Sequence, residues 1–351
     1  MVGRRNTLGW VILAGCLTIL VACSEQSCNA DKKKPQTTTQ PSKPLVKAPD
    51  FIADTAFAFV KRQVDFGPRV PGSKAHQLCG DWMMAKLKTY GAAVMEQKTT
   101  LYRFDGANVP VRNIIASFQP EKTNRIFLCA HWDSRPFGDK DPDAAKQGQP
   151  IDGANDGASG AAVLLEIARL LATQTPEIGI DLIFFDTEDM GSPESFSQAA
   201  EQLNPGYSLT WCLGSQYWIR NPHKTGYKPK YGILLDMVGS KEARFNKEKF
   251  SMERGEAIVN KIWSRAAQLG YGGYFDQREV QGVVDDHFAI MEKSSINCID
   301  IIDTRPRVAA MGLPDYAFGP FHHTHQDNLS GIHPEPLKAV GQTLMEVLYN
   351  E

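Results

Sequence analysis

The sequence predicts an α/β domain of three layers, in which helices cover both faces of a mainly parallel central sheet. Strand-like and helix-like segments alternate along most of the 351 residues, with no linker-like interruption after residue 48 and no internal repeat. Several strand candidates are short, continuous apolar runs, which are typical of strands buried on both faces. We therefore expect one folded domain from residue 48 to residue 351.

Residues 1–22 predict a signal segment that is not part of this fold. Arg4 and Arg5 precede an apolar stretch that is shorter than the roughly 20 residues needed to span a bilayer. Residues 20–23 also resemble the bacterial lipoprotein signal, in which the Cys becomes the lipidated first residue; a plain signal peptide with an incidental Cys is the alternative. We expect an exported lipoprotein that is anchored to a membrane through lipid on Cys23, with its domain periplasmic or surface-facing.

Residues 23–47 are polar and rich in Pro and Thr, so they predict a disordered tether.

The balance of 38 basic and 40 acidic residues gives no basic surface of the kind that binds nucleic acid, and we exclude that partner class. Four cysteines remain in the domain, and their spacing matches no zinc ribbon. The sequence leaves open whether any of these pair in an exported protein: Cys79, Cys129, Cys212 and Cys298.

The first half of the domain alternates helices with strands. A helix is predicted from residue 50 to about residue 62, and a Gly- and Pro-rich turn at 66–73 follows it. Ser73 then caps a second helix, which ends near Gly91. Strand candidates follow at 93–103 and 111–118, which read as a hairpin-like pair, and at 125–130. The second helix is expected to bury one face made of Ala75, Leu78, Cys79 and Trp82.

The second half repeats this alternation. Asp156 stands just before a predicted helix, and the buried strand 180–185 follows that helix. A further strand at 231–235 ends at Asp236, and a helix is predicted from about residue 252 to residue 269. The remaining elements are a short helix opened by the Asp-Asp-His at 285–287, a strand at 296–302 and a final helix at 334–349.

Acids and a histidine recur where these elements meet one edge of the sheet. His131 and Asp133 follow one strand, Glu188 and Asp189 follow the next, and Asp236 ends a third. In open α/β sheets the carboxyl ends of the strands are where ligands bind. Imidazole and carboxylate together are the ligands of a catalytic zinc. Each residue alone has a plainer explanation, such as helix capping or solvation, but capping does not require that all of them share one edge.

The order of these motifs resembles the zinc aminopeptidase superfamily, and within it the glutaminyl-peptide cyclotransferases of animal type. The resemblance runs from about Phe59 to the C-terminus and includes the turn at 66–73, the run 131–134 and His323-Thr324. Aminopeptidases of the superfamily usually have Ser-Asp-His where this chain has an Asp at 285. They also usually place Gly-Leu-x-Gly-Ser close behind their paired Glu, whereas residues 191–210 intervene here.

The resemblance implies one zinc per chain, held by Asp156, Asp189 and His323. It implies that Glu188 is the general acid/base and that Asp236 and Asp285 form an acid pair beside it. The family commonly has Glu-Glu where this chain has Glu-Asp. The implied substrates are peptides or proteins with N-terminal Gln. The implied substrate pocket includes His131, Val283, Phe318 and either Trp211 or Trp218 as the facing indole.

Two other functions remain open. An exported aminopeptidase would hold two zinc ions and cut the first peptide bond through a bridging water. Its ligands would be His131, Asp156, Asp189, Asp236 and His323. A surface lipoprotein that kept the fold only as a binding module is the third possibility. Such a protein is expected to have lost a ligand or Glu188, and this chain has lost neither.

Overall fold

The computed structural model describes residues 45–306 and 315–351. The signal segment and the lipid expected on Cys23 lie outside these ranges. Within them, no helix is both long enough and apolar enough to cross a membrane. Residues 45–351 form one compact unit.

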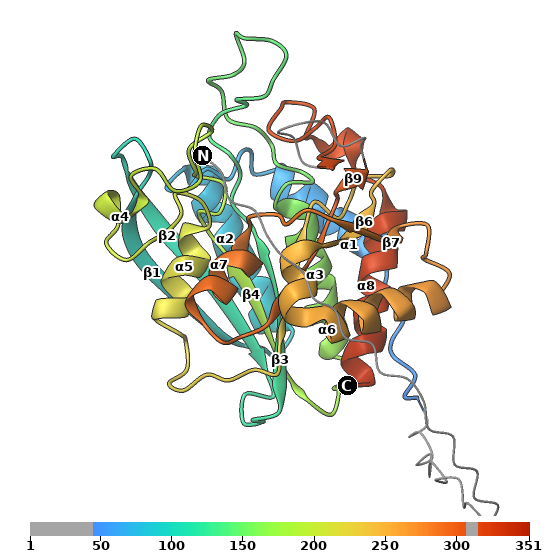
Figure 1. Ribbon diagram of the computed structural model, residues 1–351. Coiled ribbons are helices and arrows are strands. Elements are labelled where there is room, and N and C mark those ends of the chain that lie inside the picture. Colours follow the sequence, from blue (N-terminus) through green and yellow to red (C-terminus); the bar gives the residue numbers. More distant parts are fainter. Residues whose placement is uncertain (1–44, 307–314) are drawn as a thin grey trace, which may run out of the picture. The chain divides into compact units, whose positions relative to one another are not determined.

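A six-stranded sheet forms the centre of the fold (Figure 1). In spatial order its strands are β1 (Ala93–Tyr102), β2 (Asn108–Phe118), β4 (Gly179–Phe185), β3 (Arg125–His131), β5 (Gly232–Asp236) and β8 (Cys298–Ile302). The last four are parallel to one another, whereas β2 is antiparallel to both β1 and β4. The mainly parallel sheet and its antiparallel hairpin-like pair are therefore confirmed.

Side chains alternate along each central strand between two apolar cores. In β3, Ile126 and Leu128 belong to the larger core, whereas Phe127 and Cys129 belong to the smaller one. All seven positions of β3 are buried, and the same is true of β4. This double burial explains why both strands are continuous apolar runs rather than alternating ones.

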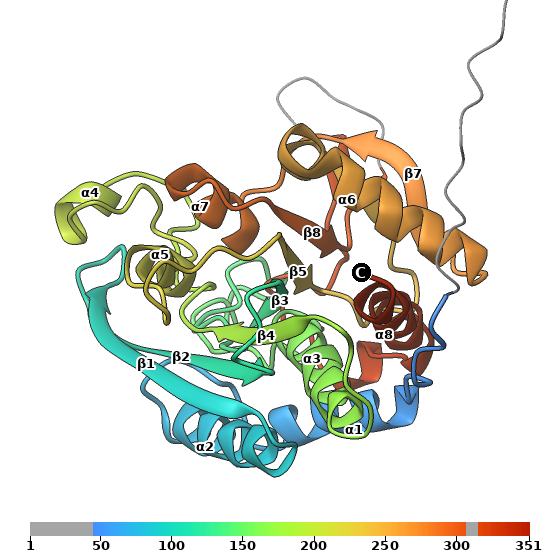
Figure 2. The ribbon, with the colours of Figure 1, turned by 90° about the horizontal axis from the view of Figure 1, so that it is seen from below.

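Helices complete the two outer layers (Figure 2). The larger core lies under α1 (Ala53–Val64), α2 (Lys74–Thr89), α3 (Ala158–Leu171), α6 (Lys249–Gln268) and α8 (Pro334–Tyr349). The smaller core lies under α5 (Leu213–Arg220) and α7 (Asp286–Lys293). The three-layer prediction is confirmed.

Several short elements were not predicted. They are α5, the helix α4 (Ala200–Leu203), the 3-10 turn η1 (Leu329–Gly331), the parallel pair β6 (Phe245–Glu248) with β7 (Phe275–Val280), and the antiparallel pair β9 (Arg305–Pro306) with β10 (Tyr316–Ala317). Most of them span too few residues for a hydrophobic period to be visible.

The predicted cap of α2 is confirmed, because the Ser73 hydroxyl accepts a hydrogen bond from the His76 backbone N–H at 3.1 Å. The buried face predicted for this helix is wrong in part, since Leu78 is 42% exposed. His76 is buried in its place: its Nε2 lies 2.9 Å from Asp186 Oδ2, and its ring stacks on Trp132. A search for apolar positions overlooks a buried polar residue of this kind.

Candidate active site

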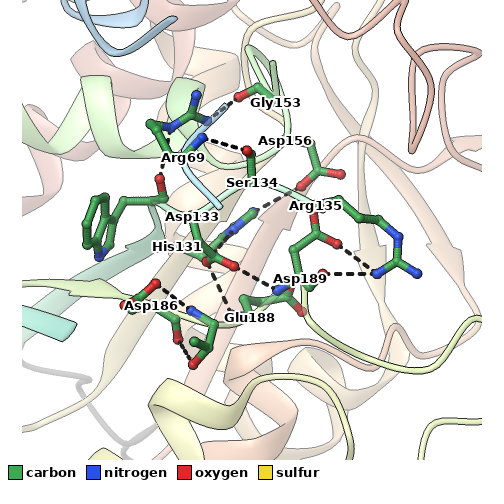
Figure 3. Close-up of polar contacts among 12 residues, drawn as sticks. Arg69, His131, Asp133, Ser134, Arg135, Gly153, Asp156, Asp186, Glu188 and Asp189 are labelled. Atoms are coloured by element: carbon green, nitrogen blue, oxygen red, sulfur yellow. Dashed lines mark hydrogen bonds and ion pairs between the residues drawn. The ribbon is translucent and has the colours of Figure 1, made fainter. Parts of the chain in front are cut away.

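The carboxyl ends of the parallel strands bring the predicted residues to one edge of the sheet. His131 ends β3, Asp236 ends β5, and Glu188 with Asp189 follows β4. Two helix starts reach the same edge, because Asp156 precedes α3 and Asp285 is the N-cap of α7. Figure 3 shows part of this cluster, with His131, Asp156 and Asp189 drawn close together.

Unusual backbone conformations concentrate around this edge. Six non-glycine residues in the described ranges have positive φ, and four of them flank the cluster: Thr187, Cys212, Met237 and His323. Such conformations cost free energy and persist only where the surrounding structure enforces them. At Thr187 (φ 58°) the chain turns sharply at the end of β4, immediately before Glu188.

Buried carboxylates hold the backbone of the site. Asp133 accepts hydrogen bonds from the N–H groups of Glu188 and Asp189, both at 3.2 Å, through its two oxygens. Asp327 does the same for Asn155 and Asp156, at 2.7 and 3.0 Å. The segments that carry the cluster are therefore tied down by side chains outside it.

Three side chains converge as a metal site requires. Nε2 of His323 lies 3.3 Å from Asp189 Oδ1 and 3.8 Å from Asp156 Oδ2. Ligand atoms placed tetrahedrally at about 2.0–2.1 Å from zinc would stand about 3.3–3.4 Å apart. Asp189 Oδ2 is also buried without a hydrogen-bond partner within the described ranges. His323 and Asp189 therefore have the spacing of two zinc ligands, and Asp156 offers a third carboxylate beside the same imidazole nitrogen.

The chain offers other donors near this triad. His322 comes within ligand distance of Asp156 and His323, but its Nδ1 lies 2.9 Å from Lys140 Nζ. His131 forms a second cluster, since its Nε2 lies 3.1 Å from Asp156 and 3.2 Å from Asp236. Burial works against the charged form of His131, but the surrounding carboxylates outweigh it and raise its pKa well above the usual value.

The two adjacent acids have opposite electrostatic environments. Burial disfavours ionisation of Asp189, but His323 and Arg135 outweigh burial and lower its pKa to about 2. Burial, followed by the charge of Asp285, raises the pKa of Glu188 well above its usual value. The Cys212 thiol donates a hydrogen bond to Glu188 Oε1 at 3.2 Å. Asp189 is thus suited to be an anionic ligand and Glu188 to carry a proton.

A pocket of about 310 Å³ opens beside the triad. Its wall includes all three predicted catalytic acids, two of the triad and three of the predicted pocket residues, namely Asp156, Glu188, Trp211, Asp236, Val283, Asp285, Phe318 and His323. The indole ring of Trp211 stacks on the imidazole of His323, with ring centroids 5.7 Å apart.

Two of the residues assigned to the pocket lie elsewhere. Trp218 is fully buried in the smaller core, where its ring packs against Phe127 and Phe185 and its N–H donates to His223. His131 lies in the carboxylate cluster described above and is 1% exposed. Of the two alternative indoles, Trp211 therefore lines the pocket, and His131 does not. The sequence locates a residue near an edge but does not show which layer its side chain enters.

Sequence reasoning missed several residues that support the site. Arg135 and Asp139 contact the triad, and Asp327 holds the turn before α3. Arg135 directly follows the run 131–134, and that position was its only signal. Asp139 and Asp327 occur in polar loops, where an acid is ordinarily solvated.

The profile of peptidase family M28 matches residues 113–348. The chain belongs to peptidase family M28. This membership confirms the predicted zinc aminopeptidase-like superfamily.

Solved structures extend the likeness. The chain is 47% identical to Bacteroides thetaiotaomicron glutaminyl cyclase bound to N-acetylhistamine, over 87% of this chain and 100% of that one, with a TM-score of 0.79. It is equally similar, at 47% identity over 87% and 100% of the two chains and a TM-score of 0.80, to a Zn-dependent exopeptidase from Parabacteroides distasonis. Aminopeptidase YwaD of Bacillus subtilis is 25% identical over 82% of this chain, which spans 54% of the length of YwaD.

Proposed function

We propose that this chain is a zinc-dependent glutaminyl-peptide cyclotransferase that converts the N-terminal Gln of peptides and proteins to pyroglutamate with release of ammonia. The observation that carries the proposal is the position of Asp285. It lines the pocket together with Glu188, and aminopeptidases of the superfamily usually have Ser in place of this Asp. The likeness to a bacterial glutaminyl cyclase over most of the chain supports it.

In this mechanism, Asp156, Asp189 and His323 hold one zinc, which when bound supplies Lewis-acid polarisation of the side-chain carbonyl. Glu188 takes a proton from the α-ammonium, so that the freed amine attacks the side-chain carbonyl carbon. Glu188 gives this proton to the amide nitrogen, and the carbon–nitrogen bond breaks as ammonia leaves. Glu188 then takes the second proton from the new ring nitrogen and passes it to the ammonia, which departs as ammonium. Holding amine and carbonyl together in the pocket provides part of the acceleration.

The other pocket residues orient the substrate. Asp285 accepts a hydrogen bond from the amide nitrogen that leaves, and Asp236 lies in the same wall between this acid and His131. Val283, Phe318 and Trp211 belong to the apolar part of the wall, which would contact the methylene groups of Gln. The pocket thus combines apolar surface with a few converging polar groups, as small-ligand sites do.

A two-zinc aminopeptidase is the second candidate, and one observation favours it. His131, Asp156 and Asp236 bring ligand atoms within 4.8 Å of one another, and all three are buried. A second metal there would serve a bridging water. Metal content per chain separates the candidates, since the cyclase needs one zinc and the aminopeptidase two.

The deciding experiment uses the purified domain with a Gln-initiated and a Leu-initiated peptide. Ammonia from the first peptide and no free amino acid from either supports the cyclase. Release of free Leu or Gln would contradict the cyclase and support the aminopeptidase. If the zinc-loaded chain releases neither ammonia nor a free amino acid, the result favours the binding module.

We propose further that Cys23 carries lipid and anchors an exported domain to a membrane. The polar, Pro-rich segment after it supports this arrangement, because it would let the domain act at a distance from the anchor. A Cys23→Ser variant is expected to leave the membrane fraction for the soluble one. Retention of this variant in the membrane fraction would contradict lipid anchoring.

A further inference from the structure

We propose that Arg135 is a positioning residue that holds two metal-binding side chains, Asp189 and His323, in place relative to each other. The inference deepens the proposed function and rests on it, because the triad belongs to that site. The role of Arg135 can be tested without any substrate.

Arg135 contacts one member of the triad directly. Its side chain is 0% exposed, and its Nη1 donates to the Asp189 backbone carbonyl at 3.0 Å and to Asp189 Oδ1 at 3.5 Å. Figure 3 shows the guanidinium beside this carboxylate. Arg135 and His323 Nε2 both face Oδ1, and the second oxygen, Oδ2, has no hydrogen-bond partner within the described residues, so Arg135 holds the orientation of this carboxylate at the triad.

Arg135 reaches the other member through a carboxylate. Its Nε and Nη2 donate to the two oxygens of Asp139 at 2.6 and 3.0 Å, a bidentate geometry. Asp139 Oδ1 in turn lies 3.3 Å from His323 Nδ1. Metal-binding histidines commonly donate their other N–H to a carboxylate, which orients the ring and fixes the tautomer. Asp139 is the carboxylate that faces His323 Nδ1 at this distance, although this nitrogen makes no hydrogen bond within the described residues.

The planar guanidinium of Arg135 also packs against two aromatic rings. Its carbon lies 4.7 Å from the centroid of the Phe137 ring and 4.5 Å from that of Trp211. Trp211 stacks on the His323 ring, so the same arginine supports His323 from a second direction. A lysine would keep the positive charge but would lose the bidentate bond and the stacking.

The loops that carry these residues need such a connection. Asp139, Asp189 and His323 lie beyond the strand ends in three different segments, which no sheet ladder joins. The Lys140 backbone N–H donates to the His323 carbonyl at 3.2 Å and ties the first segment to the third, whereas Arg135 also connects both of them to Asp189. A purely structural role would instead stabilise the loops and leave zinc affinity unchanged.

The chain provides a matched control for this distinction. Arg125 is also buried, 4% exposed, and makes a bidentate ion pair with Asp181 at 2.6 and 2.7 Å. It begins β3, whereas His131 at the site ends that strand. Arg125→Lys and Arg135→Lys thus make the same chemical change in buried pairs at opposite ends of one strand.

The test measures the unfolding midpoint of both metal-free variants and their zinc dissociation constants by competition with a chelator. We expect both variants to lose stability, but only Arg135→Lys to bind zinc more weakly, by about 10- to 100-fold. Equal zinc affinity in the two variants and the parent would overturn the proposal.

A second variant covers the case in which Arg135→Lys does not fold. Asp139→Asn keeps the shape of the side chain but removes the charge, and we expect it to weaken zinc binding about tenfold or more. Unchanged affinity in Asp139→Asn would overturn the link to His323. These binding measurements use no substrate, so they are independent of the proposed activity. If the variants bind zinc more weakly but the parent chain releases no ammonia, the proposed activity is refuted and the role of Arg135 is retained.

Discussion

Glu188 and Asp189 are neighbours in the sequence, yet their side chains serve different partners. The turn at Thr187 places Asp189 against His323 and Arg135, whereas Glu188 faces the pocket and receives the Cys212 thiol. We expect Glu188→Gln to lower turnover by about 100- to 10,000-fold, the range of a lost general acid/base, while zinc stays bound. Turnover and metal content measured on the same preparation test this.

Asp189→Ala is the companion change and should give the opposite pattern in metal content. It removes one of three ligands, so we expect most of the zinc to be lost together with the activity. Full activity in purified Glu188→Gln, or full zinc content in Asp189→Ala, would show that the two roles are assigned wrongly.

Single residues show how far the sequence could predict this site. Glu188, Asp189 and Asp236 were noticed because strand ends place them on one edge, whereas the choice of the triad and of Asp285 came from the resemblance to the cyclotransferases. The choice between Trp211 and Trp218 could not be made, since both follow the same loop and only packing decides which of them is core. Arg135 and Asp139 were missed because a buried ion pair in a polar loop has the same sequence appearance as a solvated one.

Among the elements, length decided what could be predicted. The 16-residue helix α8 has the predicted bounds, Pro334 to Tyr349, because several turns of apolar periodicity and a proline at its start define it. The 4-residue strand β6 was missed, and α6 begins at Lys249 rather than near residue 252. Its cap, Glu248, is not a typical N-cap residue, so no start signal is visible there.

Glu248 connects the start of α6 with the segment that carries Asp285. Its carboxylate accepts hydrogen bonds from the N–H groups of Phe250, Ser251 and Val283, and lies 3.1 Å from His287 Nε2. Burial disfavours its ionisation, but His287 and these bonds lower its pKa to about 2. Because the folded-state pKa is depressed, this stabilisation is present above the unfolded pKa of about 4.3 and is lost as the pH falls towards 2.

A Glu248→Gln variant should therefore lose about 2–3 kcal/mol of unfolding free energy at pH 7 relative to the parent chain. The difference should shrink as the pH falls from about 4.3 to 2, because the parent glutamate then becomes protonated. Urea unfolding of both proteins at pH 7 and at pH 3 measures it. A difference that is independent of pH would mean that the carboxylate charge does not contribute.

At the scale of the whole sheet, the strand order predicts the state of two cysteines. Cys129 in β3 and Cys298 in β8 are free and buried, and β5 runs between their strands. The two thiols face each other across β5 closely enough to interact. Two strand spacings of about 4.8 Å nevertheless separate their backbones by about 9–10 Å, which is more than the roughly 7 Å that a disulfide spans. We expect both thiols to remain reduced under oxidising conditions, as thiol titration of the denatured, air-exposed protein would show. A disulfide mapped to these two cysteines within one chain would contradict the sheet order.

Contacts with the C-terminal helix define where the folded domain begins. Residues 45–52 lie against the C-terminal helix: Val46 exchanges hydrogen bonds with Asn350, and the Phe51 N–H donates to Gln342 at 2.8 Å. The Phe51 side chain is 1% exposed and packs over Gly341, where any larger residue would meet its ring.

A chain that starts at residue 45 should therefore unfold at the same urea concentration as the full chain. A chain that starts at residue 53 should lose about 3–5 kcal/mol, the cost of removing a buried Phe, and Phe51→Ala in the full chain should reproduce most of that loss. If the chain starting at residue 53 were as stable as the one starting at residue 45, the segment would belong to the tether, and α8 would be held by α1, α3 and α6 alone.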